Sequence, residues 1–268
     1  MGVFFRRRLG WTLLWIYGLL VVAFLLAPLI VLVSISFSAT PALSFPPTGF
    51  SLQWYPLALT TPGLIGSFVL SIELAVVSAL LSALFGTAVS LAMTNRGFPG
   101  RGFLTSLFLS PLVFPSMVVG VALLQYFRTL HFDNVFLALL AGHVLVTMPY
   151  TIRTVTASLQ AFDYSLLDAA RVLGADTVRT FTEVMLPIIK PGVFAGGVFA
   201  FLISFDNYNV SMFLADAKNI PLPLRIFDYA VVALGPTVAA ISTLMIVVSV
   251  VIFVVSGRIV GVKGLAHF

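Results

Sequence analysis

The sequence contains very little charge. Only 9% of its 268 residues are charged, whereas 60% are hydrophobic. Soluble domains carry about 25% charged residues, so this chain has too few of them to cover a surface that faces water. The composition excludes an ordinary soluble protein and predicts a chain embedded in a membrane.

Several chemical groups are also missing. The chain has no cysteine, which excludes disulfide frameworks, thiolate metal sites and cysteine nucleophiles. It has no Gly-x-x-x-x-Gly-Lys-Ser/Thr loop, so we expect no nucleotide hydrolysis by this chain alone. His143 has no second histidine at its level, because His131 falls in a polar loop and His267 in the tail. We therefore expect no metal site and no cofactor in this chain, and a hydrogen bond between helices for His143.

Six apolar stretches are long enough to cross a hydrocarbon core, which needs about 20 helical residues. They cover approximately Trp11–Ser36, Leu64–Thr94, Phe103–Phe127, Val135–Tyr150, Pro191–Phe213 and Pro236–Gly257. Backbone groups in lipid must be hydrogen-bonded internally, so these stretches predict helices rather than strands. The expected fold is all-α and integral to the membrane, with six transmembrane helices in one domain over residues 1–268.

The positions of Lys and Arg predict the orientation. With the N-terminus in the cytoplasm, three of the 14 basic residues fall outside, namely Arg128, Lys218 and Arg225, and the rest fall inside. Those inside are Arg6, Arg7, Arg8, Arg96, Arg101, Arg153, Arg171, Arg179, Lys190, Arg258 and Lys263. Six helices then return the C-terminus to the cytoplasm. Loop basicity explains the net charge of +5, and we expect no nucleic-acid partner.

Two loops interrupt the apolar stretches. Residues 37–63 are rich in Pro, Ser and Thr and contain Trp54 and Tyr55, which is typical of an extracytoplasmic loop beside the membrane interface. Residues 153–190 form a charged cytoplasmic insert, in which Ser165 and Asp168 have the spacing of a capping box.

Within the insert, Leu166, Ala169, Ala170 and Leu173 form an apolar helical stripe, and Gly174 follows where a left-handed stop belongs. Asp176 or Thr177 is expected to cap a second short helix, with Pro187 leading into the next span. The pattern alone allows two interpretations: the insert docks on a soluble protein, or it lies on lipid headgroups.

The spacing within the insert distinguishes these interpretations. Asp168-Ala169-Ala170, Gly174 and Val184-Met185-Leu186-Pro187 resemble the EAA loop of ABC-importer permeases, Glu-Ala-Ala, three residues, Gly, nine residues, Ile-x-Leu-Pro. Asp replaces Glu and Val replaces Ile. The Pro-rich loop with Trp54-Tyr55, Ser204-Phe-Asp-Asn-Tyr208 and Leu222-Pro-Leu-Arg-Ile-Phe227 extend the resemblance to PotC-like permeases of spermidine/putrescine-type importers.

The resemblance implies a type I (MetI-like) permease fold in a bacterial inner membrane. It also implies that this chain forms half of a pore, completed by a related second permease. Two ATPase subunits that bind ATP and Mg would receive the EAA loop, and a periplasmic or surface binding protein would deliver the solute. The implied solute is a polyamine, with opines, aminophosphonates and ferric iron as the alternatives within related permeases.

Two carboxylates lie inside predicted spans, where an ionisable group needs a partner or a watery cavity. Glu73 belongs to the second span and Asp206 to the fifth, where Asn207 and Tyr208 follow it. Carboxylate, amide and aromatic groups together suit an organic cation. An alternative interpretation is structural: Asp206 and Asn207 hold helices together or cap a local break in the fifth span. In the same interpretation, Glu73 pairs with a residue of the second permease.

The sequence can also be compared with a membrane enzyme and with a self-sufficient channel or transporter. A six-helix membrane enzyme or redox subunit needs paired histidines, a metal set or a nucleophile group, and the spans show none. A self-sufficient channel or secondary transporter does not need a structured cytoplasmic insert. We therefore expect a non-enzymatic permease that works by alternating access.

Overall fold

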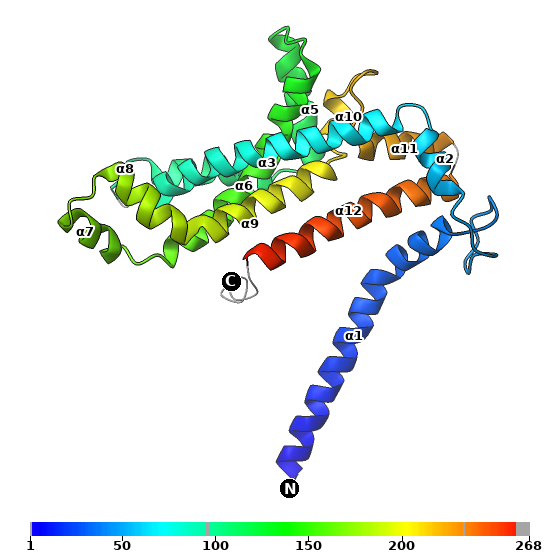
Figure 1. Ribbon diagram of the computed structural model, residues 1–268, viewed down its shortest axis with the longest axis horizontal. Helices are drawn as coiled ribbons and strands as arrows, with labels where there is room; N and C mark the ends of the chain where they lie inside the picture. The colour runs from blue at the N-terminus through cyan, green and yellow to red at the C-terminus, as the bar shows by residue number, and fades with distance from the viewer. Residues whose placement is uncertain (1, 95–96, 233, 261–268) are drawn as a thin grey trace. The chain divides into compact units, whose positions relative to one another are not determined.

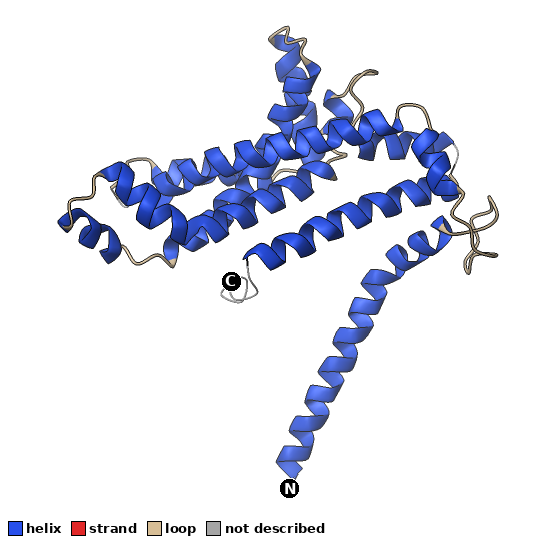
Figure 2. Ribbon diagram, viewed as in Figure 1, coloured by secondary structure: helices blue, strands red, loops and turns tan. Residues whose placement is uncertain are grey.

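The computed structural model describes residues 2–94, 97–232 and 234–260. Arg96 and Lys263, which contributed to the predicted orientation, lie outside these residues. Within them, all regular structure is helical (Figures 1 and 2). Five helices are long and apolar enough to cross a membrane, and one sharply bent pair makes a sixth candidate. The predicted all-α membrane fold is confirmed.

The described residues form two compact units, one within positions 2–62 and 228–247 and the other within positions 63–227 and 248–260. The first contains α1 (Gly2–Ser36) and α2 (Trp54–Thr60). The predicted loop 37–63 therefore includes a short helix. The Trp54 indole donates to the Ser38 carbonyl at 2.6 Å, and Tyr55 and Ser36 share a hydroxyl hydrogen bond at 2.8 Å. These aromatics fix the loop to the end of α1.

Three helices make the core of the second unit: α3 (Leu64–Thr94), α6 (Val135–Gln160) and α9 (Leu186–Phe205). They lie side by side and contact one another in all three pairs (Figure 1). The buried face of α3 is rich in serine, and Ser82 shares a 2.8 Å hydrogen bond with Thr147 of α6. Small polar residues let helices approach closely in a membrane, so this face sets the α3–α6 contact.

The third predicted span is sharply bent. It consists of α4 (Arg101–Leu109), the 3-10 turn η1 (Ser110–Leu112) and α5 (Ser116–Thr129), and its two parts meet at 105°. Pro111 and Pro115 lie at the bend, where each removes a backbone donor. The prediction of an uninterrupted helix over Phe103–Phe127 is wrong for this reason.

The fourth and fifth spans also differ from their predicted limits. α6 continues through Pro149 to Gln160, beyond the predicted end at Tyr150. The fifth span runs from α8 (Thr177–Arg179) through the π-helix η2 (Thr180–Met185) into α9, and it ends at Phe205 rather than Phe213. A break follows, and the chain resumes helix in α10 (Ser211–Leu214), α11 (Leu222–Val232) and α12 (Pro236–Val260).

Candidate functional site

Residues 153–160 of the predicted insert belong to the core helix α6, so the insert proper starts after Gln160 and its first helix is the exposed α7 (Ser165–Val172). The predicted capping box of Ser165 and Asp168 is wrong, because Ser165 is already the first residue of α7, and its amide donates a 3.0 Å hydrogen bond to the Asp163 carboxylate. Hydrogen bonds from the side chain and backbone of Ser165 lower the pKa of Asp163 below its ordinary value. Asp168 instead forms an exposed ion pair with Arg171 at 3.1 Å.

Gly174 ends α7 as the sequence predicts. Its φ is +89°, in the left-handed region that glycine adopts cheaply. The Gly174 amide donates to the Arg171 carbonyl at 2.9 Å, and the Ala175 amide donates to the Ala170 carbonyl at 3.0 Å. This pair of bonds is the Schellman arrangement, which satisfies carbonyls at a helix end and reverses the chain direction. The turn fixes the angle at which α7 leaves the rest of the insert.

The second part of the insert is continuous with a core helix. Asp176 caps it by accepting a 2.8 Å hydrogen bond from the Arg179 amide. Of the two predicted cap residues, Asp176 and Thr177, it is therefore Asp176 that caps the helix. The expected separate short helix does not occur, because the chain stays helical through η2, Pro187 and Pro191 to Phe205. Pro187 closely follows the π-helical turn η2 and Pro191 lies inside α9, and each removes one backbone donor without ending the helix. The residue that caps this part of the insert and the core helix α9 therefore belong to one continuous helical stretch.

The insert has one anchored face and one free face. Leu167, Val184 and Leu186 pack with Met185 against a buried cluster that includes Leu159 of α6 and Ile189 of α9. On the free face, Val172 and Leu173 are each 87% exposed and Val178 is 69% exposed. Contiguous exposed apolar residues mark interaction surfaces. Ala169 is exposed beside them, so the surface is partly flat.

A cavity of about 610 Å³ lies at the opposite end of α9. The break after Phe205 supplies Asp206, Asn207, Tyr208 and Asn209, and the bent third span supplies Pro111, Leu112, Phe114 and Ser116. Tyr150 and Val146 of α6 and Leu202 and Ile203 of α9 complete the lining. We call this cavity the carboxylate pocket, because Asp206 is its single charged residue.

The predicted solute residues play different parts in this pocket. Asp206 is exposed and has no ion pair within the described residues. Asn207 is buried, and its side-chain oxygen accepts a 3.1 Å hydrogen bond from the Val210 amide, within the turn that precedes α10. The Tyr208 ring lies 5.0 Å from that of Phe227. The three residues are brought together, and Asn207 makes a local hydrogen bond within the break, which is compatible with the alternative interpretation.

Glu73 does not belong to the carboxylate pocket. It lies on α3 with an exposed side chain, outside the lining residues. Sequence reasoning missed Tyr150 and Phe114 as pocket residues. For Phe114 the prolines at positions 111 and 115 carried a signal, because interrupted transmembrane helices commonly surround solute sites.

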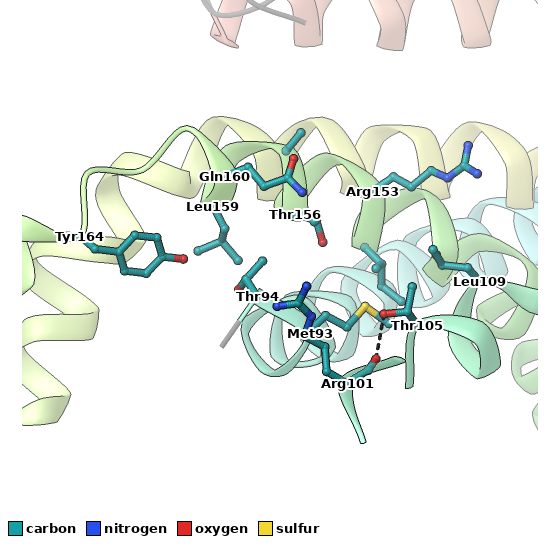
Figure 3. Close-up of a pocket in the computed structure, with 12 residues that line it drawn as sticks. Met93, Thr94, Arg101, Thr105, Leu109, Arg153, Thr156, Leu159, Gln160 and Tyr164 are labelled. Atoms are coloured by element: carbon teal, nitrogen blue, oxygen red, sulfur yellow. Dashed lines mark hydrogen bonds between the residues drawn. The ribbon is translucent and has the colours of Figure 1, made fainter. Parts of the chain in front are cut away.

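A second cavity, of about 540 Å³, lies near the insert (Figure 3). Its lining includes Thr94 of α3, Arg101 and Thr105 of α4, Arg153 and Gln160 of α6, and Tyr164 ahead of α7. Arg101 and Arg153 are both exposed, and no carboxylate lines the cavity. We call it the arginine pocket. Tyr150 in one pocket and Arg153 in the other lie within one turn of α6, so the two pockets follow one another along this helix.

The two ends of α9 are therefore chemically different. A helix of its 20 residues is about 30 Å long, close to the thickness of a bilayer core. One end supplies a carboxylate and tyrosines that suit a cation. The other continues into an insert with exposed apolar side chains that suit a protein surface.

Comparison with known proteins identifies relatives over most of the chain. The family described as "Binding-protein-dependent transport system inner membrane component" matches residues 82–261. The spermidine/putrescine transport system permease protein PotC of Escherichia coli strain K12 is 31% identical over 234 residues, which covers 87% of this chain and 88% of that protein. PotC of Haemophilus influenzae is 33% identical over 237 residues, covering 88% of this chain and 91% of that protein.

Solved structures share the fold at lower identity. A bacterial ABC transporter involved in import of the acidic polysaccharide alginate superposes with a TM-score of 0.73 at 18% identity, covering 94% of this chain and 96% of that one. The inward-facing MetNI methionine ABC transporter gives a TM-score of 0.61 at 18% identity, covering 74% of this chain and 94% of that one.

Proposed function

The chain belongs to the family of binding-protein-dependent transport system inner membrane components, and from this premise we propose that it is the permease through which a polyamine crosses. It is a multi-pass inner-membrane protein of an ABC importer. The relatives named for spermidine and putrescine favour a polyamine. The observation that carries the proposal is the carboxylate pocket, with its single carboxylate, two tyrosines and no basic residue.

The pocket chemistry matches one end of a polyamine. Asp206 offers a charge-assisted hydrogen bond to an ammonium group, and Tyr150 and Tyr208 offer aromatic faces and hydroxyls. Leu112, Val146 and further apolar residues suit the methylene chain between two ammonium groups. Since this chain provides one carboxylate, the remaining ammonium groups bind residues of the second permease.

The complete transporter in this proposal contains a related second permease, two ATPase subunits that bind ATP and Mg, and a solute-binding protein. Both termini and the insert face the cytoplasm. The free apolar face around Leu173 docks on an ATPase subunit, and the anchored face around Leu186 transmits its movement into α9. Alternating access then follows from re-orientation of α9 and the helices packed on it.

Replacing Asp206 with asparagine tests the solute assignment. The assembled transporter is reconstituted in proteoliposomes with its binding protein, and ATP-dependent uptake of spermidine is measured. A hydrogen bond to a charged group contributes about 1.5–3 kcal/mol, so Asp206→Asn is expected to raise the KM for spermidine by about tenfold to a hundredfold.

Glu73→Gln is the matched control, because it removes a carboxylate from outside the pocket. Its KM is expected to change less than that of Asp206→Asn. Unchanged uptake by a fully assembled Asp206→Asn transporter contradicts the role of Asp206. Failure of the unmodified transporter to take up spermidine or putrescine contradicts the polyamine assignment itself.

A further inference from the structure

His143 is the one buried ionisable side chain in the described core of the second unit that the transport proposal leaves unused. It lies on α6, beside the break that forms the carboxylate pocket. One ring nitrogen, Nδ1, is 2.7 Å from the hydroxyl of Ser204, before the break. The other, Nε2, is 3.0 Å from the hydroxyl of Ser211, after the break. The imidazole therefore joins the two sides of the interruption.

The hydrogen-bond network assigns the tautomer of this ring. The Ser211 hydroxyl has one proton, and it donates that proton to the Asn207 carbonyl at 2.6 Å. Ser211 must then accept from His143, so Nε2 carries the ring proton. Nδ1 is the free acceptor of a neutral imidazole, and the Ser204 hydroxyl donates to it.

The result is a directed chain of hydrogen bonds from Ser204 through His143 and Ser211 to the Asn207 carbonyl. Asn207 directly follows Asp206, so the chain ends one residue from the carboxylate. All four members are buried. A fully satisfied buried network specifies one geometry, because each alternative leaves a polar group without a partner.

Packing holds the same segment against α6. Val210 and Leu214, on the far side of the break, share a buried cluster with Leu139 of α6. Gly142 permits this approach, because a Cβ at its position would lie 2.8 Å from side-chain atoms of both Val210 and Leu214. The apolar contacts set the distance between α10 and α6, and the histidine sets the rotation and register of the intervening turn.

We infer that His143 is a positioning residue for transport, which fixes the Asp206–Asn209 turn in the conformation that receives the cationic solute. The inference rests on the proposed function and deepens it. A turn that is ordered for only a fraction of the time binds solute more weakly by that fraction. Loosening the turn therefore raises the KM for uptake, while docking of the insert at the other end of α9 continues.

Substitutions at His143 test this inference, with spermidine uptake and hydrogen–deuterium exchange as the two measurements. His143→Phe keeps the ring but removes both hydrogen bonds, and it is expected to raise the KM about tenfold. His143→Gln places an amide donor near the position of Nε2 and retains the bond to Ser211. Its KM is expected to rise less than that of His143→Phe. His143→Asn supplies an acceptor near Nδ1 but loses the bond to Ser211, so its KM is expected to rise more than that of His143→Gln and less than that of His143→Phe.

Amide exchange in the assembled transporter gives a measurement that does not depend on the solute. Exchange over residues 206–214 is expected to accelerate in His143→Phe and to remain slow in His143→Gln, with exchange over residues 165–173 unchanged in both. Ser204→Ala removes a single bond with little change in volume, and it provides the same test, with a smaller expected effect, if His143→Phe does not assemble.

The outcomes separate the inference from the proposed function. If the unmodified transporter takes up spermidine and His143→Phe has the same KM and the same exchange over residues 206–214, the positioning role is wrong. If His143→Gln is as impaired as His143→Phe, the assigned chain of hydrogen bonds is wrong. If the unmodified transporter does not take up spermidine, the polyamine assignment fails, and the exchange measurement alone decides whether His143 orders the turn.

Discussion

The interruption after Phe205 and the insert before α9 lie at opposite ends of the same helix. They differ in how far this chain itself buries and bonds their side chains. At the interruption, His143, Ser211 and Asn207 bind one another and are buried. At the insert, Val172 and Leu173 are almost fully exposed. The buried polar groups of the interruption are bonded within this chain, and the exposed Asp206 is left for a small solute. The insert needs a second protein surface to bury its apolar side chains.

Introducing a charge at Leu173 should produce the largest change. In the proposed docking interface, Leu173→Asp buries a carboxylate without a partner, at a cost of several kcal/mol. We expect ATP-dependent uptake to fall more than tenfold, with copurification of the ATPase subunit lost as well. The expected cause is loss of docking, because Leu173 is too exposed to stabilise the fold.

Two variants control for size and for charge at this surface. Leu173→Met keeps an apolar side chain and is expected to retain uptake. Thr182→Asp adds a carboxylate at an exposed polar position of the same insert and is expected to have a small effect. Normal copurification and uptake in Leu173→Asp contradict the docking role and return the insert to the lipid-headgroup interpretation.

Changing the turn at Gly174 should have an intermediate effect. Valine at φ +89° is strained, and the left-handed conformation costs an ordinary L-residue about 1–2 kcal/mol. Gly174→Val is therefore expected to redirect α7 and to lower the uptake obtained per ATP hydrolysed, while ATPase subunits remain bound. Asparagine tolerates this conformation, so Gly174→Asn should preserve more coupling.

Gly100 provides a control elsewhere in the chain. Its φ is +82°, and a Cβ at its position meets no atom within 4 Å. Gly100→Val introduces comparable strain between α3 and α4, outside the insert. Equal losses of coupling in Gly100→Val and Gly174→Val would attribute the effect to general destabilisation rather than to the angle of α7.

The sequence predicts these two regions unequally. The turn at Gly174 follows from local rules, because a left-handed stop needs only glycine after an apolar stripe. The hydrogen bond from the Ser165 amide to Asp163 was missed, because Ser165 and Asp168 match the capping-box spacing in the sequence, and only the backbone shows that Ser165 already lies inside the helix. For the carboxylate pocket, Asp206 stands out as a charge in an apolar stretch. Tyr150 and Phe114 do not stand out in the sequence, because helix packing and the 105° bend bring them into the pocket.

The helix limits show the same division. An apolar stretch predicts that a helix crosses the membrane, but hydropathy does not register the loss of backbone hydrogen bonds at Pro111 and Pro115. Hydropathy also extends the predicted fifth span to Phe213, because Val210, Met212 and Phe213 are as apolar as residues that face lipid. In the structure, Val210 packs in a protein core beyond the break. Composition identifies what is buried, and tertiary contacts decide whether lipid or protein buries it.

The smallest expected effect concerns the ion pair of Asp168 and Arg171. Both side chains are mostly exposed, at 78% and 60%, and exposed pairs at this helical spacing stabilise by about 0.2–0.5 kcal/mol. Arg171→Gln should therefore leave the thermal unfolding of the assembled transporter nearly unchanged, with uptake close to normal. Unchanged unfolding with a strong loss of uptake would show instead that Arg171 contacts the ATPase subunit. The docking surface would then extend from the apolar side chains of the insert to its charged ones.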